Sequence, residues 1–321
     1  LGQLVVPRLD HEAVTLDDLR RRRGRKWSRH PGDVIGAWIA DMDVPLAPPI
    51  RAALDRMLDD GDVGYPHDDA EASVAEAFVE RMDSLHGWRP DPGGVVLTTD
   101  LVQAVSLLLA TFTGPGDGVI LQTPIYPPFL DEVGALGRRL VANPLRRTDT
   151  TWEIDVDHLD EVASAPDVGV LLLVNPHNPS GRVLRRDELD AIAEVAHRRD
   201  LVVISDEIHS DLLHPGHHHV PFASLDAATA ERTVTLASAS KSFSIAGLRC
   251  ALVHFGSSAG LASFRRPPEH ADQWALLGWS MPQSQSSAWA VQGDCNIFER
   301  SAGSRDGYDR PLVLATQAEH L

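Results

Sequence analysis

Short apolar runs alternate with amphipathic segments along most of this chain, and this alternation constrains its fold more than any other feature. The runs have the length of strands, as in "GVILQTP", "VGVLLLVNP" and "LVVISDEI". Stretches with the period of a helix, such as "RDELDAIAEVAHRR", stand between them. Strands that are buried on both faces and separated by helices form parallel sheets. We therefore expect an α/β protein with a mostly parallel sheet between helices.

The same pattern predicts three parts of the chain. Residues 46–256 hold the alternating runs and are expected to form the large domain. Residues 1–45 contain a basic helix candidate, "TLDDLRRRRGRKW", and are expected to contribute to a small domain and to the entrance of the site. Residues 257–321 show little apolar periodicity beyond about residue 266, so this segment is expected to be divergent, truncated or frame-shifted.

Polar side chains follow four of the apolar runs, at the carboxyl ends of the expected strands. These side chains are Tyr126, Asn178, Asp206 and Lys241. Ligands of open α/β sheets bind beyond the carboxyl ends of the strands. An aromatic ring, an amide, a carboxylate and an amine are thus expected at one edge of the sheet.

Lys241 is one of only two lysines among the 29 basic residues of the chain. An amine can lose its proton and attack a carbonyl, whereas a guanidinium stays charged. A lysine kept at a strand end therefore favours Schiff-base chemistry, and a surface lysine retained by chance is the alternative. The other lysine, Lys26 in "RRRGRKWSRH", is expected to be such a surface residue.

Charge and composition exclude several classes of protein. A formal net charge of −17 disfavours nucleic acid and anionic membranes as partners. Two cysteines outside any CxxC arrangement make no disulfide framework, no signal-peptide pattern opens the sequence, and no apolar run is long enough to span a membrane. We expect a cytoplasmic protein that acts on a small molecule. We expect no metal, because the His-rich loop 214–219 is typical of a solvated segment.

Six motifs follow one another along the chain: "KWSRHPGDVIGAWIADMDVPLAPPI", "GYP", "TPIYPPF", "NPHNPSG", "SDEIHSDL" and "SKSFSIAGLR". In this order and spacing they resemble the fold-type I pyridoxal 5'-phosphate (PLP) enzymes of the aminotransferase class I and II superfamily. The resemblance runs from about residue 9 to 256. Within the superfamily, "WIADMD" is most similar to the cystathionine β-lyase or C-S lyase branch of the MalY/PatB type.

The resemblance implies an aspartate-aminotransferase-like large domain, PLP as cofactor, and a role for each strand-end residue. Lys241 would hold the cofactor as a Schiff base and move the Cα proton of the substrate. Asp206 would pair with the pyridine nitrogen and keep it protonated. Tyr126 would stack on the ring, while Asn178 and His209 would bind its phenolic oxygen. Lys241, Asp206 and Tyr126 are therefore the expected catalytic residues.

A phosphate site and a second subunit are also implied by the resemblance. The residues expected to hold the phosphate are Arg249, Ser238, Ser240, Leu101 and Val102, the last two through backbone N–H groups. Tyr65 resembles the tyrosine that reaches the phosphate of the neighbouring subunit, which implies a homodimer with shared sites. Taken singly, each residue of the constellation could equally serve the fold as a helix cap, a turn, core packing or a surface charge.

Two features depart from the family pattern. Asp100 in "LTTDLVQAV" places a negative side chain where the family begins a helix under the phosphate, and it is expected to weaken phosphate binding unless it points away. Beyond about residue 266 the resemblance is expected to end. The C-terminal small domain, with the arginine that binds the substrate carboxylate, is then absent or abnormal, through truncation, a shifted frame or a divergent native tail.

Three functions follow. The first is a PLP-dependent C-S β-lyase that converts cystathionine or a related S-substituted cysteine into thiol, pyruvate and ammonia. The second is a PLP-dependent aminotransferase of amino acids. The third is a non-catalytic or truncated product that binds PLP without turnover, because loss of the carboxylate-binding arginine removes a contact of roughly 1.5–3 kcal/mol.

Overall fold

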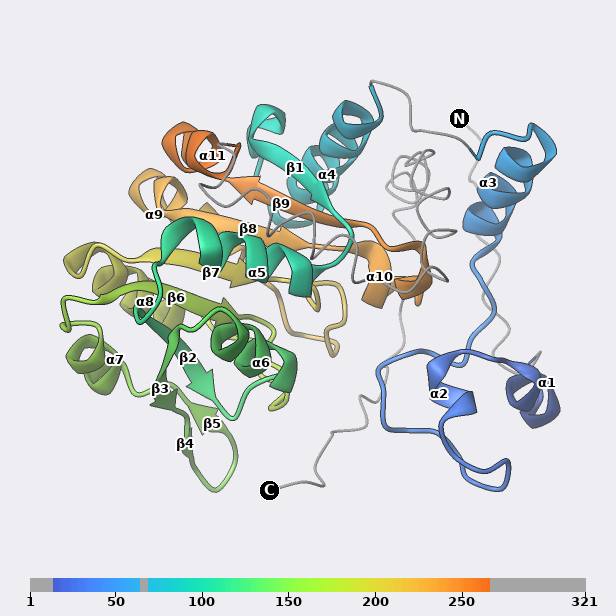
Figure 1. Ribbon diagram of the computed structural model, residues 1–321, viewed down its shortest axis with the longest axis horizontal. Helices are drawn as coiled ribbons and strands as arrows, with labels where there is room; N and C mark the ends of the chain where they lie inside the picture. Colours follow the sequence, from blue (N-terminus) through green and yellow to red (C-terminus); the bar gives the residue numbers. More distant parts are fainter. Residues whose placement is uncertain (1–13, 64–68, 266–321) are drawn as a thin grey trace.

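A seven-stranded sheet with the strand order β1-β9-β8-β7-β6-β2-β3 lies at the centre of the computed structural model, which describes residues 14–63 and 69–265 (Figure 1). The pairs that β9 makes with β1 and β8 are antiparallel, and the other four pairs are parallel. The strands are β1 (Val95–Thr98), β2 (Gly118–Thr123), β3 (Arg139–Pro144), β6 (Val168–Val174), β7 (Val202–Asp206), β8 (Thr233–Ala237) and β9 (Ala251–Phe255). The α/β class and the mostly parallel sheet are as predicted.

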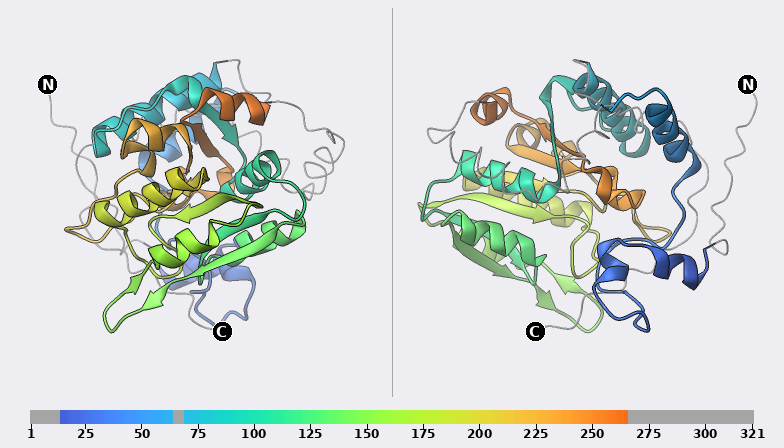
Figure 2. Two further views of the ribbon diagram at one scale, coloured as in Figure 1. Left: turned by 90° about the vertical axis from the view of Figure 1, so that its left-hand side faces the viewer. Right: turned by 45° about the vertical axis from the view of Figure 1, so that its right-hand side comes forward.

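Helices cover both faces of the sheet, as Figures 1 and 2 show. One face packs against α5 (Leu101–Phe112), α6 (Pro127–Ala135) and α11 (Ser258–Arg265). The other packs against α4 (Ala70–His86), α7 (Val156–Val162) and α8 (Arg186–Arg198). Because both faces are buried, β6 has no polar alternation: Leu172 lies in the core under α5, and its neighbour Leu173 lies in the core under α8.

Several short elements complete the described chain. The helices are α9 (Ala227–Glu231) and α10 (Ala239–Ser242), the 3-10 turns are η2 (Pro92–Gly94), η3 (Phe222–Ser224) and η4 (Ala246–Leu248), and the hairpin is β4 (Arg146–Arg147) with β5 (Trp152–Glu153). No helix of the described ranges combines the length and the apolar character that a membrane crossing requires.

The N-terminal segment lies beyond the carboxyl edge of the sheet, where Figure 1 shows α1 (Leu16–Arg21) and α2 (Arg25–Ser28) in blue. The single helix predicted here is interrupted after α1, because Arg22 takes an extended conformation and Gly24 caps α2. α3 (Pro48–Asp59) follows. The segment that joins α2 to α3 contacts the loop after α10, where Ser244 Oγ accepts a hydrogen bond from Met42 N–H at 3.0 Å.

The end of the described chain is α11, which packs Leu261 and Phe264 against the core under α5. The predicted domain boundary at residue 256 therefore has an ordered helix directly after it, although the three-part division itself stays a prediction. The segment from residue 266 to 321 lies outside the described residues, as does Tyr65.

Candidate active site

Four neighbouring parallel strands deliver the predicted side chains to one edge of the sheet. Tyr126 follows β2 and caps α6, Asn178 follows β6, Asp206 is the last residue of β7, and Lys241 lies in α10 directly after β8. Asp206 interacts electrostatically with both Lys241 and Tyr126. The structure thus places a ring, an amide, a carboxylate and an amine at the position where such sheets bind ligands.

The Asp206 carboxyl is buried, with 3% of the residue exposed to solvent. Among the described residues, it accepts one hydrogen bond, from Ile208 N–H at 3.1 Å. Burial raises its pKa to about 7, against the smaller opposing effects of that hydrogen bond and of Lys241. A buried carboxylate with so few donors gains stability from a cationic partner, so the site favours a positively charged ligand group beside Asp206.

Burial lowers the pKa of the half-buried Lys241 amine, while Asp41 and Asp206 act in the opposite direction. Its Nζ atom donates to the carbonyl oxygen of Ala40 at 3.4 Å. A lowered pKa increases the neutral fraction of the amine, which is the nucleophilic form. Lys241 is therefore suited to attack a carbonyl.

Asn178 lies in a loop that other side chains hold in place. Leu184 N–H donates to Asn175 Oδ1 at 2.9 Å, His177 Nδ1 contacts Ser180 Oγ at 2.8 Å, and Gly181 adopts a positive φ of 71° that closes the turn. Within the described part of the chain, no hydrogen bond engages the Asn178 side chain, which is half-buried. The amide is available to a ligand.

His209 is buried near Lys241, with 9% of the residue exposed. Its Nδ1 atom has no hydrogen-bond partner among the described residues. Burial, together with the nearby Lys241 charge, lowers its pKa to about 4, so the ring is neutral at physiological pH. A neutral imidazole with a free ring nitrogen can bind a polar ligand atom.

The residues predicted to hold a phosphate group have partners within the protein. Ser238 caps α10: its Oγ donates to Cys250 O at 2.7 Å and accepts from Ser240 N–H at 3.1 Å. Arg249 takes a left-handed conformation with φ of 56° after η4 and forms an ion pair with Asp100. Asp100 therefore does not point away from this region.

Leu101 and Val102 are the first two residues of α5, which begins directly after Asp100. The backbone N–H groups of a first turn have no partner within their own helix and point toward its N-terminal end. Together with the guanidinium of Arg249 they form a positively polarised corner beside the carboxyl edge of the sheet.

The prediction that Lys26 is a chance surface lysine is wrong. Its side chain is only 11% exposed, and Nζ forms an ion pair with Asp43 Oδ2 at 2.7 Å and donates to Asp41 O at 2.7 Å. Trp27 Nε1 donates to the other oxygen of Asp43 at 2.8 Å. The sequence patterns did not predict this cluster, although Asp41 and Asp43 both belong to the motif "WIADMD".

The prediction of a solvated His-rich loop holds for His214, His217 and His218, which are exposed, but it is wrong for His219. His219 is buried, and its Nε2 atom contacts Glu207 Oε2 at 2.9 Å. Glu207 also accepts a hydrogen bond from Ser205 Oγ at 2.9 Å. Across residues 14–63 and 69–265, no three acidic, histidine or cysteine side chains converge as metal ligands would.

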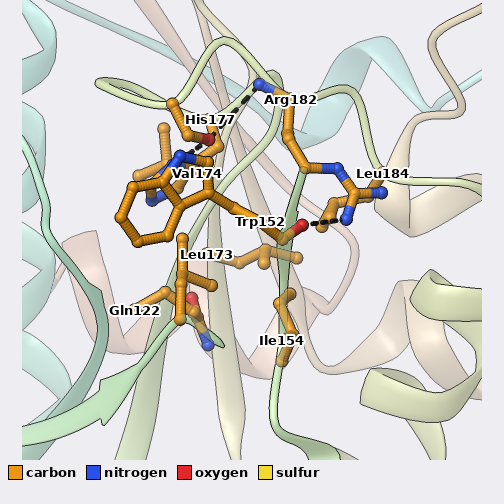
Figure 3. Close-up of a pocket in the computed structure, with 10 residues that line it drawn as sticks. Gln122, Trp152, Ile154, Leu173, Val174, His177, Arg182 and Leu184 are labelled. Carbon is orange, nitrogen blue, oxygen red and sulfur yellow. Dashed lines mark hydrogen bonds between the residues drawn. The ribbon is translucent and has the colours of Figure 1, made fainter. Parts of the chain in front are cut away.

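One pocket lies behind the Asn178 loop rather than over Lys241 (Figure 3). Its lining includes Trp152, Leu173, Val174 and Arg182, which Figure 3 labels. None of the predicted site residues lines it. The pocket is mostly apolar and belongs to the packing that supports the loop.

Comparisons with known proteins agree with this geometry. Residues 43–291 match the family model of aminotransferase class I and II. A protein of Mycobacterium tuberculosis (strain CDC 1551 / Oshkosh) named putative cystathionine beta-lyase is 38% identical over 97% of this chain and 75% of its own length. Both matches extend past residue 266, so the similarity does not end there as expected.

The cystathionine beta-lyase PatB of Bacillus subtilis (strain 168) is 40% identical over 221 residues, which are 69% of this chain. The chain spans 57% of the length of that relative. Among solved structures, cystalysin from Treponema denticola, which contains a pyridoxal 5'-phosphate cofactor, superposes with a TM-score of 0.73 at 28% identity, covering 88% of this chain and 73% of the other.

Proposed function

Because the chain belongs to the aminotransferase class I and II family, we propose that it binds PLP and is a C-S β-lyase. Its substrate is cystathionine or a related S-substituted cysteine, and its products are thiol, pyruvate and ammonia. The observation that carries this proposal is the juxtaposition of a buried Asp206, whose pKa is raised, with a half-buried Lys241, whose pKa is lowered. The lyase assignment is supported by the relatives named cystathionine beta-lyase.

The residues present fit PLP. The Asp206 carboxyl is buried and accepts a single hydrogen bond from the described part of the chain, which suits a partner of a protonated ring nitrogen. His209 Nδ1 lacks a partner within the described residues, and the half-buried Asn178 amide is available for the phenolic oxygen. Arg249 and the start of α5, which both contact Asp100, are the groups that would bind a phosphate.

When bound, PLP supplies an electron sink that stabilises negative charge at the Cα atom of an amino acid. The protein supplies the rest. Lys241 would hold the cofactor and would take the proton from the Cα atom of the substrate. Asp206 would be the partner of a protonated ring nitrogen, and Tyr126 would pack against the ring. A lyase would release the Cβ substituent of its substrate as a thiolate, whereas an aminotransferase would leave that bond intact.

The decisive experiment incubates the full chain with PLP and cystathionine. We expect pyruvate and thiol to accumulate in equal amounts when no keto-acid acceptor is added. Strict dependence on a keto acid would instead identify the aminotransferase. Bound PLP without either product would identify the non-catalytic alternative, and Lys241→Ala serves as the inactive control in every arm.

We also propose a cytoplasmic homodimer in which Tyr65 reaches the partner's phosphate site. The low cysteine content supports a reducing compartment, and the family resemblance supports the shared site. Mixing an inactive Lys241→Ala chain with an inactive Tyr65→Phe chain tests it: a mixed dimer of this kind regains one intact site and part of the activity. No recovery from a demonstrated mixed dimer would contradict the shared site.

A further inference from the structure

Asp100 joins two positive groups of the site through its two carboxylate oxygens. Oδ1 accepts a hydrogen bond from Gln103 N–H at 2.8 Å, which caps α5, and Oδ2 forms an ion pair with Arg249. A helix N-terminus and a guanidinium both attract anions. The carboxylate therefore occupies a corner of the site that suits a negative group.

The backbone around this carboxylate is itself fixed. Thr98 Oγ1 donates to the carbonyl oxygen of Asp100 at 3.3 Å. Gln103 Oε1 accepts from Thr99 N–H at 3.0 Å and from the Thr99 hydroxyl at 2.8 Å. With both ends of the turn held, Asp100 cannot leave the corner without breaking its cap or its ion pair.

The charge of Asp100 also acts on the ligand side of the corner. Burial raises the pKa of Tyr126, and Asp100 is the charged group that adds most to this rise, ahead of Asp206. Tyr126 is the residue assigned to the cofactor ring. The negative potential of Asp100 therefore extends to the space that the cofactor would fill.

We propose, on the basis of the proposed function, that Asp100 is an internal anion that competes with the cofactor phosphate for Arg249 and for the start of α5. Without cofactor, Asp100 neutralises both groups. With cofactor, two negative groups share one guanidinium and one helix N-terminus, which weakens binding. Removal of this charge should strengthen the binding of a phosphate-bearing ligand, whereas removal of a residue that only supports the fold should not.

The variant Asp100→Asn separates charge from capping, because asparagine caps helices as well as aspartate does. We expect the dissociation constant of the full chain for PLP, measured by fluorescence titration of the cofactor-free protein, to fall roughly tenfold, a size suited to partly exposed charges. The constant for pyridoxal, which has no phosphate, should stay unchanged.

Asp155→Asn is the matched control. Asp155 caps α7 through His158 N–H at 3.1 Å and lies 3.6 Å from Arg146, so it has the same two kinds of contact away from the site. Its substitution should leave both constants unchanged. A similar gain in Asp155→Asn would show a general charge effect and would overturn the proposal.

The remaining outcomes distinguish failure of the proposed competition from failure of the proposed cofactor. If Asp100→Asn binds PLP as the original chain does, or more weakly, competition is refuted while the proposed cofactor stands. If both ligands bind more tightly, the gain does not come from the phosphate, and competition is again refuted. If neither protein binds PLP, the proposed cofactor is refuted and this inference with it.

Discussion

Asp206→Asn tests the electrostatic basis of the site without cofactor or substrate. Asparagine has nearly the shape of a protonated carboxyl but cannot ionise. The pKa of Asp206 is about 7 in the folded protein against 3.8 for the unfolded reference. Because the folded pKa is the higher one, the stability that this group contributes is complete below pH 3.8 and is lost as the pH rises through 7.

The expected size follows from these two pKa values. At 1.36 kcal/mol for each pKa unit, the raised pKa of Asp206 costs the folded protein about 2 kcal/mol at pH 5 and about 4 kcal/mol at pH 8. Asp206→Asn should therefore gain about 2 to 3 kcal/mol of unfolding free energy relative to the original chain between these pH values. The comparison of the two proteins cancels the groups that titrate in both.

Urea unfolding of the cofactor-free proteins at pH 5 and pH 8 measures this difference. Added PLP should reduce the pH dependence of the original chain, because a cationic ring nitrogen stabilises the ionised carboxyl. The variant should keep bound PLP but lose most turnover. Equal pH dependence in the two cofactor-free proteins would show that Asp206 is not held in a proton-retaining environment, and the reasoning about the site would fail.

Three further predictions concern other buried groups. Lys241→Ala should abolish the borohydride-trapped PLP adduct seen by mass spectrometry, while Lys26→Ala should retain it; an adduct mapped to Lys26 would refute the assignment. Lys26→Ala should cost about 2 kcal/mol of unfolding free energy, because Asp43 loses a partner, whereas Arg20→Ala, which removes an exposed pair with Asp17 at 3.6 Å, should cost little. Burial lowers the pKa of His254 to about 4, so its stabilising contribution is present above pH 6.5 and is lost as the pH falls. His254→Leu should therefore reduce the loss of unfolding free energy at acid pH by about 3 kcal/mol. An unchanged dependence of the unfolding free energy on pH would contradict this.

The mostly parallel sheet and the polar side chains at the ends of its strands were predictable, because both follow from local sequence. The run "VGVLLLV" buries both of its faces, which fixes it as an inner parallel strand and puts the Asn178 loop at its carboxyl end. The same reasoning places Asp206 and Lys241 one strand apart. No long-range knowledge is needed, since parallel neighbours share an edge.

Pairings between distant residues were not predictable from these patterns. Asp100 and Arg249 lie at opposite ends of the core sequence, and they meet only because β9 returns antiparallel between β1 and β8. His219 belongs to a run of histidines that are otherwise exposed, and only its contact with Glu207 distinguishes it. The spacing of apolar residues and the composition of turns do not indicate which charged side chains will pair in the folded protein.

The two lysines of this arginine-rich chain both contact the segment 40–43. Lys241 Nζ donates to Ala40 O at 3.4 Å, and Lys26 Nζ donates to Asp41 O at 2.7 Å and pairs with Asp43. The compact ammonium group of Lys26 binds a backbone carbonyl and a carboxylate at the same time. The larger, planar guanidinium of arginine is less suited to this partly buried position. Ser244 holds the same segment through Met42 N–H. These contacts connect the N-terminal segment to the loop after α10. Loss of the Lys26 side chain should therefore alter the position of Lys241 through the backbone of residues 40–43.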